Sequence, residues 1–559
     1  MTASEDNSQT LPHAILAAAS AHPDVPVIFH GGGRSAPVSV ADLVGQAARC
    51  AAAFRDLGVQ PGDTVAVQVP SRIDGVIAQA AAVLAGAVLV PVVSSYGPRE
   101  LGFILRESRA RLLVTPDRWG RRDYLADLHR VGDCPDLSSV AIIADSVPQK
   151  YIDFRQLLNG SEPWSAPTAA APDEVCLLVY TSGTTGQPKG VQHTHTTLLA
   201  ELHTRLTGNA ADSVILAAFP SGHVAGTLGL LRMLLQGVPH VVIDTWDATT
   251  AARLINEHGV TATGGTPFFL TTLLDLADEV DLSCLREYGV GGASVPPSVI
   301  ERAHQHGIMA FRAYGSSEHP TISGGSAEDT LDKRAQTDGR LIDGVEIRIV
   351  GDALQDLPAG TFGEILSRGP ELFVGYRDSA LDADAFLPGR WFRTGDIGVL
   401  DLDGYLTITD RRKDLIIRGG ENLSSKLIED ILAEHEAVAE AAVVAAPDPL
   451  YGERVCAFVV LRPAAALSLT DIRAHFSVAG TARHLTPERL EIVDDLPRTA
   501  TGKVRKDELR RRIGRPGLVG SVCGPIAPIP SNGVAHFGDA LNCESAAGTA
   551  PRIKRGRDA

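Results

Sequence analysis

The sequence lacks the features that mark several protein classes. Its seven cysteines, at positions 50, 134, 176, 284, 456, 523 and 543, form no CxxC pair and have no metal-type spacing with histidine. Zinc sites and disulfide frameworks depend on such spacing, so we expect reduced structural thiols. The longest apolar run, residues 80–93, has 14 residues and contains Gly86 and Pro91. A membrane-spanning helix needs about 20 apolar residues, so we expect no integral membrane association.

An excess of positive charge is also missing. The 51 Lys and Arg residues are outnumbered by 67 Asp and Glu, which gives a formal net charge of −16. This balance argues against nucleic acid or an anionic membrane as the main partner, and it is compatible with a local basic cleft. The first ten residues, MTASEDNSQT, lack the basic-then-apolar order of a signal peptide. We therefore expect a cytoplasmic protein.

The length and pattern of the chain indicate its fold class. With 559 residues, 44% of them hydrophobic and 21% charged, it is a globular sequence too long for one core, so we expect two or three domains. Apolar residues at helical spacing predict a helix over residues 43–57, and alternating valines predict a strand over residues 65–69. A further strand is predicted at residues 88–93. Alternating helices and strands predict crossover units in a largely parallel sheet, which is an α/β fold.

Residues 180–191, YTSGTTGQPKGV, form the most informative segment. They hold three glycines, a run of hydroxyl side chains and Lys189, and they lie between a predicted buried strand at 175–179 and a helical pattern at 197–206. A glycine-rich loop between a strand and a helix can surround one anion with backbone N–H groups and hydroxyls. The GxxxxGK[ST] pattern is excluded because Gly190 follows Lys189. Most Gly/Ser/Thr clusters are exposed turns, but this one is longer than a turn needs and predicts a phosphate-binding loop.

This loop resembles that of the adenylate-forming superfamily, which includes acyl-CoA synthetases, luciferases and peptide-synthetase adenylation domains. Further segments match the family in its order, over roughly residues 38–511: PSGH at 220–223, GVGGASVP at 289–296, AYGSSE at 313–318, WFRTGD at 391–396, DRRKD at 410–414 and PRTATGKVRK at 497–506. The resemblance implies a large N-terminal domain (12–411) of layered α/β subdomains with parallel-rich sheets and a β-rich segment. A small mobile α+β cap (412–511) is expected to follow it. Residues 512–559, rich in Pro, Gly, Ser and Ala, are expected to be a disordered tail.

The resemblance also implies a nucleotide site. In it, Tyr314 offers a flat face to the purine, and Ser317 offers a hydroxyl to the α-phosphate where the family usually has threonine. Asp396, expected on a tight Thr-Gly turn, accepts hydrogen bonds from the ribose hydroxyls. The residues expected to bind ATP or AMP are Thr181, Ser182, Gly183, Thr184, Thr185, Gly186, Lys189, Gly292, Ala293, Tyr314, Gly315, Ser317, Asp396, Arg411 and Lys503.

Three residues are implied to be catalytic. The ammonium of Lys503 is expected to reach the substrate carboxylate and the α-phosphate. Glu318 and Thr184 are expected to hold Mg²⁺ through oxygen atoms. Lys413 matches the family's hinge position, although a charge run such as 410–414 is normally just a solvated surface.

The acyl and CoA site is implied to contain His223, Gly291, Gly315 and Gly420. A lone histidine after a strand is usually structural, so the role of His223 depends on the resemblance. Acetyl-specific relatives fill the acyl pocket with tryptophan where this chain has Gly315, and Gly226, Gly229, Gly264 and Gly265 lie in the same motif regions. These glycines predict space for an apolar acid larger than acetate: fatty, alicyclic or aromatic. No aspartate occurs between residues 219 and 231, which disfavours an α-amino acid.

The first interpretation is therefore an ATP-dependent carboxylic acid:CoA ligase with Mg²⁺ as cofactor and ATP and CoA as co-substrates. The alternative is a stand-alone acyl-AMP ligase that loads a separate carrier protein. Ser425 and Leu427 depart from the family pattern in the segment expected to meet CoA, which leaves the acceptor open. A luciferase-like oxygenase and a non-catalytic nucleotide-binding protein are further alternatives. Retention of Lys189, Glu318, Asp396, Arg411 and Lys503 argues against the last of these.

Overall fold

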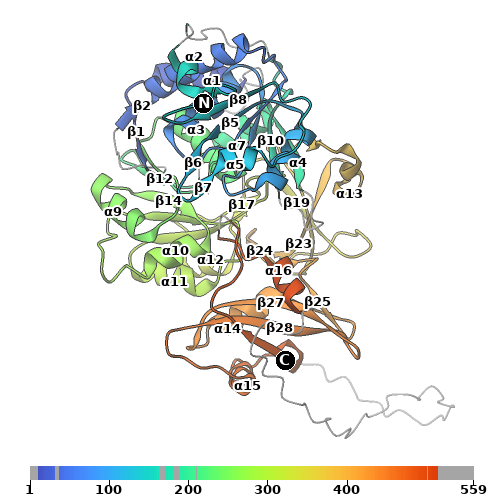
Figure 1. Ribbon diagram of the computed structural model, residues 1–559. Helices are drawn as coiled ribbons and strands as arrows, with labels where there is room; N and C mark the ends of the chain where they lie inside the picture. Colours follow the sequence, from blue (N-terminus) through green and yellow to red (C-terminus); the bar gives the residue numbers. More distant parts are fainter. Residues whose placement is uncertain are drawn as a thin grey trace, which may run out of the picture. The chain divides into compact units, whose positions relative to one another are not determined.

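The computed structural model describes residues 10–31, 37–159, 162, 170–181, 188–204, 206–208, 210–499 and 502–513 (Figure 1). These residues belong to one compact unit, residues 1–520. They form an α/β protein with a large N-terminal domain of parallel-rich sheets and a small C-terminal domain, as predicted. The predicted tail, residues 514–559, lies outside the described residues.

The first large sheet has nine strands among the described residues. Their order is β18-β17-β16-β15-β14-β12-β13-β1-β2, and the six strands from β16 to β1 are parallel. Parallel strands end at a common edge, so β12, β14, β15 and β16 present the residues that follow them on one side. The strands are β1 (Pro26–His30), β2 (Pro37–Ser39), β12 (Ile215–Ala217), β13 (His240–Ile243), β14 (Ala262–Gly265), β15 (Glu287–Val290), β16 (Met309–Tyr314), β17 (Ser323–Gly324) and β18 (Arg340–Leu341).

The second large sheet contains the strand that precedes the glycine-rich loop. Its order among the described residues is β21-β11-β10-β4-β3-β5-β8-β9, parallel from β10 to β9 and antiparallel at β11 and β21. The strands are β3 (Thr64–Val67), β4 (Val88–Pro91), β5 (Ala110–Pro116), β8 (Ser139–Ile143), β9 (Ile152–Asp153), β10 (Val175–Thr181), β11 (Lys189–Thr194) and β21 (Gly375–Tyr376). The two-stranded β6 (Arg118–Trp119) and β7 (Arg122–Asp123) lie apart from it.

Helices in the large domain alternate with these strands, and some of them begin or end at a capping residue. Ser39 accepts a hydrogen bond from the N–H of Asp42 at the start of α2, and Gly259 ends α9 in the left-handed region with φ +60. The helices are α1 (Leu11–Ala21), α2 (Val40–Asp56), α3 (Ile73–Leu84), α4 (Pro98–Ser108), α5 (Tyr124–Leu128), α6 (Phe154–Asn159), α7 (His195–His203), α8 (Val224–Leu235), α9 (Ala248–His258), α10 (Pro267–Leu274), α11 (Pro297–Gln305), α12 (Leu331–Gln336), η1 (Ser379–Leu381) and α13 (Asp382–Ala385).

The strand predicted at residues 65–69 differs in extent. It begins at Thr64 and ends at Val67, and all four residues of β3 are buried. Strands buried on both faces are typical of a parallel sheet, in which the crossover helices cover both sides. The helix predicted at 43–57 is confirmed as α2.

The β-rich segment and the small domain are two further sheets. The first contains β19 (Glu346–Val350), β20 (Gly363–Arg368), β22 (Phe386–Leu387), β23 (Trp391–Leu400) and β24 (Leu406–Arg411). The second contains β25 (Ile416–Arg418), β26 (Glu421–Leu423), β27 (Val438–Asp448), β28 (Gly452–Leu461) and β29 (Arg489–Ile492). Figure 1 shows α14 (Ser425–Ala433) and α16 (Lys506–Ile513) beside β27, with which both make contacts. The remaining helices are α15 (Leu469–Val478) and η2 (Arg483–Leu485).

None of the helices formed by the described residues has both the length and the apolar character that crossing a membrane requires. Cys50, Cys134, Cys176, Cys284 and Cys456 are free thiols, and positions 523 and 543 lie outside the described part of the chain.

Candidate active site

The predicted phosphate loop connects two antiparallel strands. β10 and β11 pair with Tyr180 opposite Gly190 and Thr181 opposite Lys189. The expected strand–loop–helix order was wrong, because β11 precedes α7; its polar residues, KGVQHT, conceal the strand in the sequence. The predicted Ser182, Gly183, Thr184, Thr185 and Gly186 lie outside the described residues. Thr181 and Lys189 therefore mark the two ends of the loop.

Tyr376 contacts both Lys189 and Glu318. The Lys189 Nζ is 5.1 Å from the ring centroid of Tyr376, and the Tyr376 hydroxyl donates to Glu318 Oε1 at 2.9 Å. Burial raises the pKa of Tyr376, and the nearby charge of Glu318 raises it further. The hydroxyl thus stays protonated and remains a donor at neutral pH.

A buried histidine fixes the segment that carries Ser317 and Glu318. His193 Nε2 is 2.8 Å from the carbonyl oxygen of Ser317, and its Nδ1 is 3.2 Å from Thr197 Oγ1. Burial lowers the pKa of His193 to about 4, so the ring is neutral at pH 7 and Nε2 donates to the carbonyl. His193 was not predicted, because nothing in its local pattern distinguishes it from a core residue.

The second cluster surrounds Asp396. The Tyr314 hydroxyl donates to Asp396 Oδ2 at 2.7 Å, and Arg411 Nε lies 3.1 Å from Oδ1. Asp396 is 4% exposed. A carboxylate has about four lone-pair positions, so two contacts leave room for two hydroxyl donors.

The local backbone at Asp396 differs from the predicted tight turn. Asp396 lies inside the ten-residue strand β23, opposite Arg411 of β24. Gly395 has φ +70, and the register with β24 shifts between Ile397 and Gly398. A bulge of this kind re-aims a side chain without ending the strand.

Lys503 shares these surroundings. The positive charge of Arg411, followed by burial and the charge of Lys413, lowers the pKa of Lys503 to about 7, against the opposing effect of Asp396. Lys503 is held beside Thr499, since Thr499 N donates to Lys503 O at 2.8 Å and Lys503 N donates to Thr499 Oγ1 at 3.1 Å. Lys503 thus lies close enough to Arg411 and Asp396 for their charges to act on its pKa, although they are about 100 residues apart in sequence.

Other predicted residues follow the carboxyl ends of the parallel strands. Gly291 N donates to Gly265 O at 3.0 Å, and Gly292, with φ +77, and Ala293 come directly after it. His223 precedes α8, and its Nε2 is buried with no hydrogen-bond partner among the described residues. Burial lowers the pKa of His223 to about 4, so the ring is neutral. These positions form the edge at which ligands bind in parallel α/β sheets.

The space predicted beside Gly315 is not there. A Cβ at Gly315 would lie 1.9 Å from the Pro320 carbonyl oxygen, so the glycine permits close approach of two backbone segments. A Cβ at Gly226 would similarly lie 2.0 Å from Pro220 O, and one at Gly265 would lie 2.4 Å from the Tyr288 hydroxyl. A Cβ at Gly264 would lie 3.3 Å from Gly289 O. Of these five glycines, only Gly229 has no atom within 4 Å of an added Cβ. Counting glycines was therefore a wrong basis for estimating pocket size.

The remaining two predicted residues lie in turns. Lys413 is in the turn between β24 and β25, and Gly420, with φ +91, is in the hairpin turn between β25 and β26. Neither is joined to Lys189, Glu318 or Tyr376 by a hydrogen bond or ion pair found among the described residues.

The residues present suit a magnesium ion carried by phosphates. Mg²⁺ is usually bound through one or two carboxylates together with substrate phosphates and water. Glu318 supplies one carboxylate, and no described residue is hydrogen-bonded to its Oε2. The described residues contain no group of three metal-ligating side chains. A site formed by protein ligands alone is not found in this part of the chain.

The chain matches two protein-family models and is similar to known CoA ligases. A model of the AMP-binding enzyme family matches residues 15–377, and one of the AMP-binding enzyme C-terminal domain matches residues 427–503. A medium-chain fatty-acid–CoA ligase of Escherichia coli strain K12 is 34% identical over 521 residues, which cover 91% of each chain.

Two further relatives differ in the acid for which they are named. A Rhodococcus jostii strain RHA1 CoA ligase for a 3-(7a-methyl-1,5-dioxo-octahydro-1H-inden-4-yl)propanoyl group is 33% identical over 485 residues, covering 82% of this chain and 91% of that one. The solved structure of the anthranilate CoA ligase AuaEII in complex with anthranoyl-AMP aligns with a TM-score of 0.82 at 25% identity, covering 92% of this chain and 99% of that one.

Proposed function

The chain belongs to the AMP-binding enzyme family and is an AMP-forming acid–thiol ligase, and we propose that it joins an apolar carboxylic acid to coenzyme A through an acyl adenylate. ATP and CoA are its co-substrates. The observation that carries the proposal is the contact of Tyr314 and Arg411 with the carboxylate of Asp396, with Lys503 close enough for the charge of Arg411 to lower its pKa. This grouping offers a nucleotide a ribose acceptor, an aromatic side chain and two cations at one place.

The chemistry requires charge neutralisation and alignment. A carboxylate oxygen attacks the α-phosphorus of ATP, the bond to the β-phosphate oxygen breaks, and pyrophosphate leaves. Both reactants are anions, so positioning and cationic groups supply the catalysis. Lys503 lies between carboxylate and α-phosphate in this proposal. Lys189 and the loop residues Thr181, Ser182, Gly183, Thr184, Thr185 and Gly186 bind the β- and γ-phosphates.

The remaining site residues are assigned by the same proposal. Glu318 and Thr184 hold Mg²⁺, which when bound neutralises phosphate charge. Asp396 accepts from the ribose hydroxyls, and Arg411 contacts ribose and phosphate. Tyr314, Gly315, Gly292 and Ala293 border the adenine, and Ser317 donates to the α-phosphate.

The second step transfers the acyl group to a thiol. The CoA sulfur attacks the acyl carbon, the bond from that carbon to the phosphate oxygen breaks, and AMP leaves. We propose that the small domain, residues 412–511, turns about Lys413 after adenylation and withdraws Lys503. We propose the domain boundary at Arg411, where β24 ends. Gly420 then borders the path of CoA.

The acid is proposed to be apolar. The relatives described above are named for a medium-chain fatty acid, a bicyclic propanoate and anthranilate, all of which have a large hydrophobic part. The acyl group is placed near His223 and Gly291, at the carboxyl edge of the nine-stranded sheet. Since ATP and CoA are both supplied in the cytoplasm, that is the proposed compartment.

Acid-dependent ATP–pyrophosphate exchange tests the proposed function. A panel of medium-chain, alicyclic and aromatic acids is expected to support exchange without CoA, and CoA is then expected to release AMP. AMP release with a phosphopantetheinylated carrier protein and none with CoA would favour the carrier-loading alternative. Failure of every acid to support exchange would contradict adenylation.

The lowered pKa of Lys503 predicts a pH dependence. Only the protonated ammonium can neutralise the reacting anions, so kcat/KM for ATP in the exchange reaction should fall as pH rises above about 7. The triphosphate stabilises the ammonium once bound, so the fall in kcat should occur at higher pH. The measurement is exchange kinetics between about pH 6 and 9. A flat or rising kcat/KM across that range would contradict the assignment.

Glu318→Gln tests the metal assignment. The amide retains the size of the side chain and can still accept from Tyr376, but it loses the charge that binds Mg²⁺. Exchange should fall by about 100-fold, because a charged ligand contributes several kcal/mol to a phosphoryl-transfer site. Conversion of supplied acyl adenylate to thioester should change little. Equal losses in the two steps, or no loss, would remove Glu318 from the metal role.

A further inference from the structure

A short segment ties the phosphate loop to Glu318. Phe373 N donates to Glu318 O at 2.8 Å, and Arg377 N donates to Gly190 O at 2.7 Å. Between them, Val374 N donates to Gln192 O at 3.0 Å, and β21 pairs antiparallel with β11. Residues 373–377 therefore link two motifs that are more than 120 residues apart in sequence.

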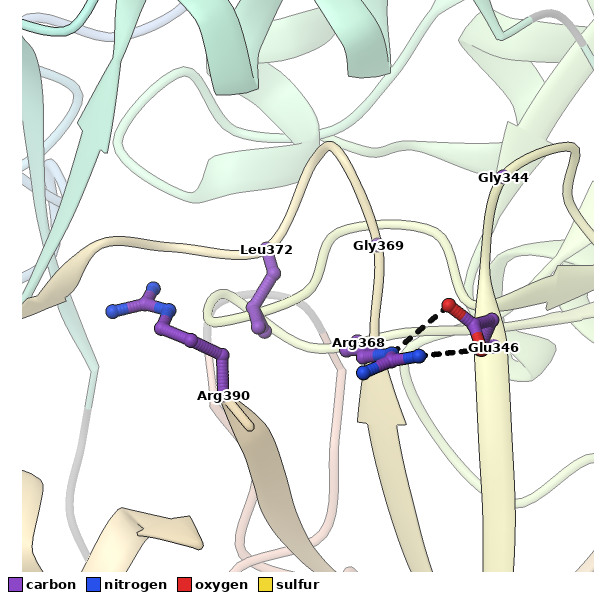
Figure 2. Close-up of a pocket in the computed structure, with 6 residues that line it drawn as sticks. All are labelled: Gly344, Glu346, Arg368, Gly369, Leu372 and Arg390. Carbon is purple, nitrogen blue, oxygen red and sulfur yellow. Dashed lines mark hydrogen bonds and ion pairs between the residues drawn. The ribbon is translucent and has the colours of Figure 1, made fainter. Parts of the chain in front are cut away.

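Side chains hold this segment from two sides. Arg390 Nη2 donates to Phe373 O at 2.9 Å, and Tyr376 N donates to Asp382 Oδ1 at 2.8 Å. Figure 2 shows Arg390 and Leu372 on one side of a surface pocket and the paired Arg368 and Glu346 on the other.

Tyr376 is the residue of this segment that touches both charged groups of the site. Its hydroxyl donates to Glu318, its ring lies against the Lys189 ammonium, and its exposed fraction is only 5%. The ring packs on Phe373, with centroids 4.9 Å apart at an interplanar angle of 65°. A ring packed in this way has one position, so the direction of its hydroxyl is fixed.

The contacts keep two opposite charges apart. Glu318 and Lys189, both in the described part of the chain, form no ion pair with each other, and each contacts Tyr376 instead. A cation held over an aromatic face is stabilised without neutralisation, and a phenol donor to a carboxylate leaves its negative charge in place. Both charges thus remain available to a ligand.

We propose that Tyr376 is a positioning residue that holds Glu318 and Lys189 as separate sites for the cation and the phosphates of magnesium–ATP. This inference rests on the proposed function and adds to it a residue that determines the preference for the magnesium complex over free ATP. Removing the hydroxyl frees the Glu318 carboxylate to rotate towards Lys189 and pair with it. Such a pair binds neither Mg²⁺ nor phosphate well.

Tyr376→Phe tests the proposal, because it retains the ring and its packing. ATP binding is measured by calorimetry with excess Mg²⁺ and with EDTA. In the wild type, Mg²⁺ should strengthen binding; in Y376F this strengthening should fall by about 10-fold, since a hydrogen bond to a charged group is lost. Affinity in EDTA should change much less. A merely structural role would weaken binding equally in the two conditions.

Tyr405→Phe provides a matched control. Tyr405 is 7% exposed, its hydroxyl donates to Asp329 Oδ1 at 2.6 Å, and Lys333 Nζ lies 4.5 Å from its ring centroid. The arrangement thus has the same three parts as that of Tyr376, but none of its residues belongs to the proposed site. The Mg²⁺ effect on ATP binding should be that of the wild type.

A double-mutant cycle separates positioning of Glu318 from other effects. If Tyr376 acts through the Glu318 carboxylate, Y376F should have no additional effect on the Mg²⁺ dependence in an E318Q background. An additional loss of the same size, or an unchanged Mg²⁺ effect in the single variant, would overturn the inference alone. Absence of ATP binding by the wild type in either condition would remove the proposed function, and this inference with it.

Discussion

Lys503→Ala is expected to reduce ATP–pyrophosphate exchange by about 10²- to 10³-fold, the usual cost of removing one preorganised group that stabilises developing charge. The ammonium lies in the surroundings of Asp396 and Arg411, where a nucleotide is proposed to bind.

The same variant should convert supplied acyl adenylate to thioester at close to the wild-type rate. In the proposed cycle Lys503 acts only in the first step and is withdrawn before the thiol attacks. The two steps are measured separately, by isotope exchange and by AMP release from acyl adenylate and CoA. Arg505→Ala is the control, because Arg505 is an exposed cation two residues away with only surface ion pairs. Equal loss of both steps in K503A would contradict the division between them.

Asp396→Asn should weaken both steps. The ribose is bound throughout the cycle, so loss of its acceptor lowers the affinity for ATP and for acyl adenylate. Asparagine also places an amide where Arg411 Nε and the Tyr314 hydroxyl now meet a carboxylate. Removing the charged partner of such contacts costs about 1.5–3 kcal/mol, which is about 10- to 100-fold in affinity.

Calorimetry with ATP and with AMP measures this effect directly. Asp356→Asn is the matched control, since Asp356 Oδ1 accepts from Arg348 Nε at 2.6 Å on an exposed surface. Its binding of ATP and AMP should equal that of the wild type. Unchanged nucleotide affinity in D396N, or loss of only one of the two half-reactions, would contradict the assignment to ribose.

The Lys503 and Asp396 variants are thus expected to differ in which half-reactions they slow, although the two residues belong to one proposed site. One variant separates the half-reactions and the other affects them together. A nucleotide-binding protein without catalysis would show the Asp396 effect on binding and no effect of Lys503 on any turnover.

The sequence predicted those parts of the fold that depend on local pattern. The helix over residues 43–57 was predicted because its apolar residues have helical spacing, and they face the core in α2. The strand β10 was predicted from a short apolar run before the glycine-rich loop. The order of the motifs predicted which residues would share a site, and Tyr314, Asp396, Arg411 and Lys503 are brought together.

The rest depended on contacts that no local pattern shows. β11 is a polar strand whose pairing with β10 and β21 makes it a strand, so it was missed between the loop and the helix. Asp396 lies in a bulged strand because β24 pairs across it. Gly315 faces the Pro320 carbonyl, a close approach that becomes visible only when the loop is folded.

The roles of His193 and Tyr376 were missed for the same reason. Each is a single buried residue in a strand, and each bonds to a motif that is distant in the sequence. Their partners, Ser317 and Glu318, were identified from a motif. A residue that positions a motif residue has no motif of its own, and only the folded chain places the two side by side.

Transfer of oxygen from the acid to AMP tests the central claim most directly. If the carboxylate attacks the α-phosphorus and a thiol later attacks the acyl carbon, one acid oxygen must remain on AMP. An apolar acid labelled with ¹⁸O in its carboxylate, incubated with ATP, Mg²⁺ and CoA, should give AMP that carries one ¹⁸O atom, as measured by mass spectrometry. Unlabelled AMP, or ¹⁸O found in inorganic phosphate with ADP as the nucleotide product, would contradict the acyl adenylate.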